Sequence, residues 1–125
     1  MTRPPPLPPP HLRDPGDAWV EGPNGKKYWG TFGAAGLLLL HPPLGVLLQL
    51  RAEWSHQGGT WGIPGGALKK GEDAVTAAIR ESQEEAGIPN GAARVIDHSV
   101  YDLGFWSYTT VLAIAENYFE PQITD

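Results

Sequence analysis

One stretch of the sequence, in the middle of the chain, has the repeat of an amphipathic helix and lies between two groups of short strand-like runs. From Glu72 to Ala86, apolar or small side chains recur three and four residues apart, at positions 75, 78, 79, 82 and 86. This spacing places them on one face of an α-helix that packs against another layer. Gly71 precedes the run and Gly87 ends it. A 125-residue chain with one helix among strands predicts a single α+β domain with a mixed sheet.

The strand-like runs before the helix are bounded by turn residues. Asn24-Gly25 lies between two short runs rich in aromatic side chains, which predicts a β-hairpin. Residues 31–40 and 46–50 are apolar and are separated by a Pro-Pro-Leu-Gly turn, so we expect two buried, paired strands. Beyond the helix, residues 94–101 and 105–115 predict two more strands. We expect the core to include three tryptophans, Trp29, Trp61 and Trp106.

The N-terminal segment differs in composition from the rest of the chain. Seven of the first fifteen residues are proline, which favours a polyproline-II segment outside the core. We therefore place a leader at residues 1–17 and the folded domain at 18–125. The leader is either a solvated segment or a ligand for a proline-binding module. It has no apolar signal region, and no run of the sequence is long enough for a membrane helix, so we expect a cytoplasmic protein without a membrane partner.

Charge and cysteine content exclude several classes of function. Nine lysines and arginines stand against fourteen aspartates and glutamates, a net charge of −5. This balance argues against a partner such as a nucleic-acid polymer. The chain has no cysteine, so it has no disulfide, no thiolate nucleophile and no cysteine-based metal site. Any bound metal is held by oxygen or imidazole.

The predicted helix carries a cluster of carboxylates. Glu81, Glu84 and Glu85 lie within one turn of each other, where like charges repel. A hard divalent cation such as Mg²⁺ or Mn²⁺ prefers oxygen ligands and relieves that repulsion. Arg80, four residues before Glu84, could hold that carboxylate in place. The alternative is a solvated acidic face with an ordinary Arg–Glu pair.

The segment before the helix favours the metal-site interpretation. Trp61-Gly62-Ile63-Pro64-Gly65-Gly66 is rich in glycine, which lets a backbone carbonyl approach a metal. Residues 66–88 match the pattern G-x5-E-x7-R-E-U-x-E-E-x-G-U at all seven fixed positions, where U is a bulky aliphatic residue. This pattern is the Nudix box, so the chain resembles the Nudix hydrolase family over roughly residues 30–115. Ser82 departs from it, because it stands at a U position, and we expect it to loosen helix packing.

The resemblance implies a Nudix fold, an α/β/α sandwich with a mixed sheet and a loop–helix–loop box that binds Mg²⁺ or Mn²⁺. It also implies hydrolysis of a pyrophosphate bond in a nucleoside diphosphate linked to another group. Carried over residue by residue, it makes Arg80 orient Glu84 and Glu72 support Arg80. The catalytic base is Glu81 as the first choice, with Glu116 and Glu120 as later-loop alternatives. The implied metal ligands are the Gly66 carbonyl and the side chains of Glu81, Glu84, Glu85 and Glu116.

The substrate is a nucleotide-type small molecule, and the short connection from Pro89 to Arg94 favours a nucleoside triphosphate, oxidised or not. ADP-ribose, a nucleotide sugar and a dinucleoside polyphosphate stay open as alternatives, as does a non-catalytic nucleotide-binding module of the same fold. Position 103 is leucine and not the proline typical of ADP-ribose-cleaving relatives. Arg51 is a candidate for contacting phosphates, and Trp54 and His56 for stacking on a base. The alternatives are a plain surface arginine and incidental aromatic residues in a loop.

The C-terminal end has no helical repeat after Ala115, and it contains Pro121. The related fold continues into a second helix, so we expect one sheet face to lack its helix. An apolar face of that kind is a liability for a monomer. We therefore expect a partner chain, as in a homodimer, or the N-terminal segment to cover it, or the chain to be truncated.

Overall fold

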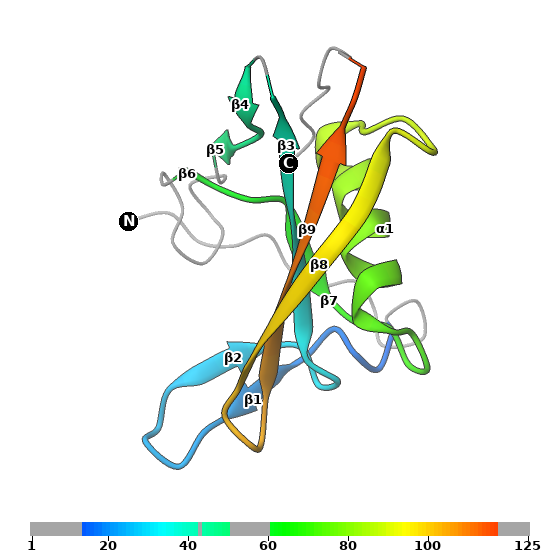
Figure 1. Ribbon diagram of the computed structural model, residues 1–125. Helices are drawn as coiled ribbons and strands as arrows, with labels where there is room; N and C mark the ends of the chain where they lie inside the picture. Colours follow the sequence, from blue (N-terminus) through cyan, green and yellow to red (C-terminus); the bar gives the residue numbers. More distant parts are fainter. Residues whose placement is uncertain (1–13, 43, 51–60, 118–125) are drawn as a thin grey trace.

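A five-stranded mixed sheet forms the framework of the computed structural model, which describes residues 14–42, 44–50 and 61–117 (Figure 1). Its order is β4 (Gly45–Val46), β3 (Ala34–His41), β9 (Ser107–Ala115) and β8 (Ala93–Asp102), and β7 (Gly65–Ala67) pairs with the start of β3. The neighbours β3 and β9 are parallel, whereas the other pairs are antiparallel. The α+β class and the mixed sheet are confirmed.

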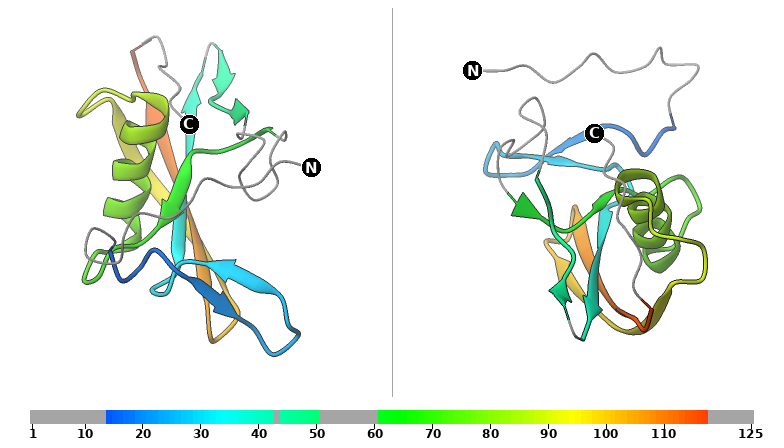
Figure 2. Two further views of the ribbon diagram at one scale, coloured as in Figure 1. Left: turned by 180° about the vertical axis from the view of Figure 1, so that it is seen from behind. Right: turned by 90° about the horizontal axis from the view of Figure 1, so that it is seen from above.

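The helix α1 (Ala74–Ala86) covers one face of this sheet (Figure 2). It begins at Ala74 and not at Glu72, because the Asp73 side chain accepts a hydrogen bond from the Thr76 N–H and caps the helix. It ends at Gly87, whose φ of 65° is left-handed and whose N–H donates to the Gln83 carbonyl.

Small side chains let α1 approach the sheet closely. Of the five positions expected on the packed face, Ala78, Ser82 and Ala86 are buried, and Ala77 is buried with them. They pack on alternate residues of the two central strands, which are fully or almost fully buried: Ala35, Leu37, Leu39, Val111, Ala113 and Ala115. Ser82 is also fully buried, and its hydroxyl donates to the Ile79 carbonyl at 2.7 Å.

A separate hairpin lies across one end of the sheet (Figure 1). It consists of β1 (Trp19–Glu21) and β2 (Lys27–Trp29), which pair antiparallel around the Asn24-Gly25 turn, as predicted. Tyr28 contacts Trp106 with ring centroids 4.8 Å apart, and the Trp106 indole N–H donates to the Trp29 carbonyl at 3.0 Å. Trp29 and Trp106 are therefore half-buried members of an aromatic cluster and not of the main core.

The prediction of a second buried apolar strand at residues 46–50 is wrong. Only Gly45–Val46 pairs with β3, because the chain turns away and β5 (Gln49–Leu50) pairs with β6 (Trp61–Gly62) instead. Val46 and Leu48 are both exposed. The glycine-rich segment before the helix supplies the strand β7.

The face of the sheet opposite α1 is more open. By alternation it carries Leu38, Leu40, Leu112 and Ile114, all of which are half-buried. A second helix layer is not part of the described residues, so the expectation about how this face is covered stays a prediction. No helix in the described part of the chain is long and apolar enough to cross a membrane.

Candidate active site

The junction between β7 and α1 brings the glycine-rich segment against the charged face of the helix. A Cβ on Gly66 would overlap the Glu81 carboxylate, and its distance to the Glu81 Cδ would be only 2.5 Å. A Cβ on Gly65 would press on the backbone of Ala35 and Gly36 in β3. These two glycines therefore allow β7 to lie between the sheet and a carboxylate of the helix.

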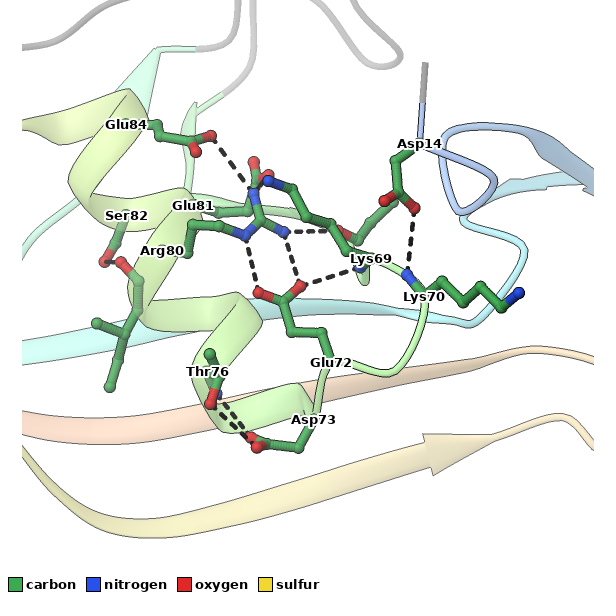
Figure 3. Close-up of polar contacts among 12 residues, drawn as sticks. Asp14, Lys69, Lys70, Glu72, Asp73, Thr76, Arg80, Glu81, Ser82 and Glu84 are labelled. Atoms are coloured by element: carbon green, nitrogen blue, oxygen red, sulfur yellow. Dashed lines mark hydrogen bonds and ion pairs between the residues drawn. The ribbon is translucent and has the colours of Figure 1, made fainter. Parts of the chain in front are cut away.

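Arg80 is the centre of the polar network at this junction (Figure 3). Its Nε and Nη2 donate to the two carboxylate oxygens of Glu72, at 2.8 and 2.9 Å. Its Nη1 donates to Glu81 at 2.6 Å and to Glu84 at 3.4 Å. Nη2 also donates to the Ala67 carbonyl at 3.1 Å. One guanidinium therefore ties the loop before the helix, the middle of the helix and β7 together.

The network shifts the pKa values of its members. Hydrogen bonds from Arg80 hold the pKa of Glu72 below its ordinary value, and the Lys69 N–H adds to this effect. In return, the hydrogen bonds to Glu72 and then to Glu81 raise the pKa of Arg80. Both side chains thus stay charged at neutral pH.

The carboxylates on the helix differ in how exposed they are and in which groups bind them. The Glu81 side chain is 16% exposed, whereas that of Glu84 is 57% exposed. Glu85 accepts a hydrogen bond from the Gly65 N–H at 3.2 Å. These three side chains project from one turn beside β7 and supply only oxygen donors, which is the chemistry that Mg²⁺ and Mn²⁺ prefer. In the described ranges, no three acidic or histidine side chains converge closely enough to hold a metal ion as they stand. It is the oxygen-only chemistry of the set, and not its present geometry, that suits a hard cation.

In the structure, Arg80 binds other carboxylates more closely than the one that was expected. The resemblance predicted that it orients Glu84, but its shortest bonds reach Glu72 and Glu81. The reason is exposure, because Glu84 points further into solvent than either. The support of Arg80 by Glu72 agrees with the geometry.

Glu116 has a different partner from the box residues. It forms an ion pair with Arg94 at 2.8 Å, between the end of β9 and the start of β8. Four other candidates, Arg51, Trp54, His56 and Glu120, lie outside the described residues.

Sequence reasoning missed Asp14, whose carboxylate accepts from the Lys70 N–H at 3.2 Å and from the Gly16 N–H at 2.8 Å. Gly16 itself lies so close to the Leu68 carbonyl that a Cβ there would overlap it. The segment before the hairpin thus packs against the loop that leads into α1. No spacing in the sequence indicates a contact across 56 residues.

Comparison with known proteins agrees with this geometry. A family model described as NUDIX domain matches residues 30–121, which is most of the chain. The chain belongs to the Nudix hydrolase family. Among solved structures, a Nudix hydrolase from M. smegmatis, RenU, is 43% identical, with a TM-score of 0.78 over 88% of this chain and 74% of that one. An Ap4A hydrolase from C. elegans is 32% identical, with a TM-score of 0.60 over 73% of this chain and 71% of that one.

Curated relatives point the same way. A protein of Mycobacterium tuberculosis named putative 8-oxo-dGTP diphosphatase 3 is 51% identical over 83% of this chain. A nucleoside triphosphate pyrophosphatase/Nudix hydrolase fusion protein of Bifidobacterium longum is 45% identical over 92% of it. The Nudix chain spans 52% of the first relative and 26% of the second.

Proposed function

We propose that this Nudix chain is a metal-dependent pyrophosphohydrolase that cleaves a nucleoside triphosphate to a nucleoside monophosphate and pyrophosphate. The observation that carries the proposal is the joint presence of Gly66, Arg80 and three glutamates at one junction of strand and helix. A solvated acidic helix face needs neither a glycine under Glu81 nor an arginine that bonds three carboxylates.

The proposed metal ligands are the Gly66 carbonyl and the carboxylates of Glu81, Glu84 and Glu85. A bound Mg²⁺ or Mn²⁺ neutralises phosphate oxygens and lowers the pKa of a water molecule. The protein's own part is to position these oxygens. Arg80 fixes Glu81, and Glu72 fixes Arg80 through two hydrogen bonds.

We assign the general base to Glu81. Its carboxylate lies over Gly66, where no side chain separates it from the β7 backbone. Arg80 holds one of its oxygens, which leaves the second to accept a proton from water. Glu116 is the weaker candidate. It forms an ion pair with Arg94 where β9 ends and β8 begins, and not at the junction of β7 and α1.

The substrate class rests on the relatives. One curated relative carries the name putative 8-oxo-dGTP diphosphatase 3, which favours a triphosphate, oxidised or not. The resemblance to an Ap4A hydrolase keeps dinucleoside polyphosphates as the next candidate. ADP-ribose and nucleotide sugars follow. Arg51, Trp54 and His56 are the proposed contacts to phosphate and base.

A non-catalytic nucleotide-binding module is the second candidate. It would need the fold but not the charged network, in which Arg80 bonds three glutamates. The retained network therefore favours the enzyme.

A substrate panel tests the proposal. The purified chain is incubated with Mg²⁺ and dGTP, 8-oxo-dGTP, Ap4A or ADP-ribose, and the products are separated by chromatography. We expect monophosphate and pyrophosphate from a triphosphate, with no turnover in EDTA. Glu21→Gln in the exposed hairpin strand is the matched control for changes in the box. Binding of nucleotides without any metal-dependent product would overturn the enzyme and support the binding module.

A further inference from the structure

The strand β8 is the edge of the main sheet on the side away from β3 (Figure 1). It is ten residues long, and every residue from Arg94 to Asp102 is exposed. No strand among residues 14–42, 44–50 and 61–117 pairs with its outer side. Two of its large apolar side chains, Val100 and Tyr101, are 52% and 64% exposed.

An edge of this length presents a row of backbone N–H and C=O groups that can pair with another strand. A bulge between Val95 and Asp97 interrupts the regular ladder with β9. From Asp97 to Asp102 the ladder is regular over six residues. This segment, which we call the β8 edge, is the part able to accept a partner strand. Its His98 N–H donates to the Asp97 carboxylate at 2.8 Å and has to leave that bond in order to pair.

We propose that the β8 edge pairs antiparallel with the same segment of a second copy of this chain, around a two-fold axis at Val100. The two sheets then continue into one another. The proposal concerns an interface and does not depend on the proposed function.

Symmetry limits the possible registers. In a continuous antiparallel sheet, opposite residues point to the same face, so a residue with an even number faces another with an even number. A two-fold axis also makes each contact occur twice, with the roles exchanged. The axis therefore lies at a residue of the β8 edge and not between two residues.

The side chains that face each other favour an axis at Val100 over an axis at the other residues. With the axis there, His98 lies opposite Asp102 of the second copy, and Val100 lies opposite its own counterpart. Ser99 then lies opposite Tyr101. An axis at Ser99 would instead place Val100 opposite His98 and Tyr101 opposite Asp97. An axis at Tyr101 leaves only three residues in the pairing. An axis at His98 needs residues on the far side of the bulge.

The interface leaves the candidate active site open. β9 and β3 separate β8 from β7, where Gly66 and Glu81 meet. A pairing of five residues per copy is small, so we expect a weak dimer with a Kd of about 10–500 µM.

Sedimentation velocity over a concentration series tests the proposal. We expect a monomer–dimer equilibrium for the unchanged chain. Val100→Lys puts two ammonium groups opposite one another at the axis and should weaken the dimer by at least about 30-fold. Leu44→Lys is the control, because Leu44 is 68% exposed and lies in the turn between β3 and β4, away from the β8 edge.

A second pair of variants tests the register itself. His98→Glu faces Asp102 with a like charge and should weaken the dimer about 10-fold. Adding Asp102→Asn removes that repulsion and should restore it, while the amide oxygen can still accept from the Gly104 N–H that Asp102 now binds at 2.7 Å. Circular dichroism of each variant reports folding. A chain that stays monomeric up to about 1 mM, or a dimer that a folded Val100→Lys variant leaves unchanged, would overturn the proposal.

Discussion

The two faces of helix α1 are built by different rules. The face toward the sheet consists of small side chains that are fully buried: Ala77, Ala78, Ser82 and Ala86. The other face carries Arg80 and Glu81, which are largely buried, and Glu84, which is mostly exposed. Size decides the first face, because each side chain must fit between the helix and β3. Charge decides the second.

This difference separates stability from chemistry within one helix. A change in volume on the packed face should affect folding and leave the carboxylates in place. A change of charge on the outer face should affect metal binding and leave the core intact. Arg80 is the exception, since it is half-buried and also bonds the carboxylates.

Glu81→Gln should give the largest loss. The change keeps the shape of the side chain but removes the charge that we assign to metal binding and proton transfer. We expect the rate of hydrolysis to fall about 10³-fold, equivalent to about 4 kcal/mol. The rate is measured with the substrate found in the panel, beside Glu21→Gln as control. A folded variant with unchanged turnover would refute the role of Glu81.

Arg80→Ala should affect both properties. It leaves Glu72 and Glu81, which are 11% and 16% exposed, without their main hydrogen-bond donor. We expect the free energy of unfolding to fall by about 2–3 kcal/mol and the affinity for Mn²⁺ to fall about 10–100-fold. Arg94→Ala, which breaks an exposed ion pair, should cost at most about 1 kcal/mol. If metal titration is unchanged and only the affinity for substrate falls, Arg80 contacts phosphate instead.

Ala78→Leu should affect folding alone. Ala78 is fully buried against the sheet, and three added carbons have no space there. Overpacking of this kind costs about 1–3 kcal/mol. Urea unfolding measures the loss, and Gln83→Leu on the partly exposed side is the control. A fall in turnover of the folded variant as large as that of Glu81→Gln would contradict the separation of the two faces.

Glu72→Gln should give a smaller, pH-dependent loss. The pKa of Glu72 is lowered from its usual 4.5, so its ionised form stabilises the folded state above that pH. This contribution, about 1–2 kcal/mol at pH 7, should vanish as the pH falls through the lowered value. Unfolding of both proteins between pH 7 and pH 3 therefore yields curves that converge in acid. A constant difference across this range would show that the carboxylate charge is not the cause.

The site was more predictable from the sequence than the sheet was. The positions of Gly66, Arg80 and the glutamates follow from helical spacing and from the box pattern, and these are local features. The pairing of β5 with β6 and the position of β7 depend on contacts between distant residues, which no local pattern specifies. The same holds for the bond of Asp14 to the Lys70 N–H.

Ser82 shows that a sequence pattern can predict which face of a helix a residue lies on, but not how well its side chain packs there. Its place in the repeat predicted the buried face, and the structure confirms it. The expected loosening of the helix is not visible, because neighbouring alanines let α1 lie close to the sheet and the hydroxyl bonds to the Ile79 carbonyl. Depth of packing depends on the opposite layer, which the helix sequence alone does not contain.

The most direct test of the account is Glu84→Gln, measured for both hydrolysis and stability. Glu84 is 57% exposed, and its bond to Arg80 is the longest of the three, so it adds little to folding. If the outer face binds a catalytic metal, the rate at saturating Mg²⁺ should fall by about 10²-fold or more, while the free energy of unfolding without metal changes by less than about 0.5 kcal/mol. Near-normal turnover in this folded variant would contradict the central claim that these carboxylates hold the metal for catalysis.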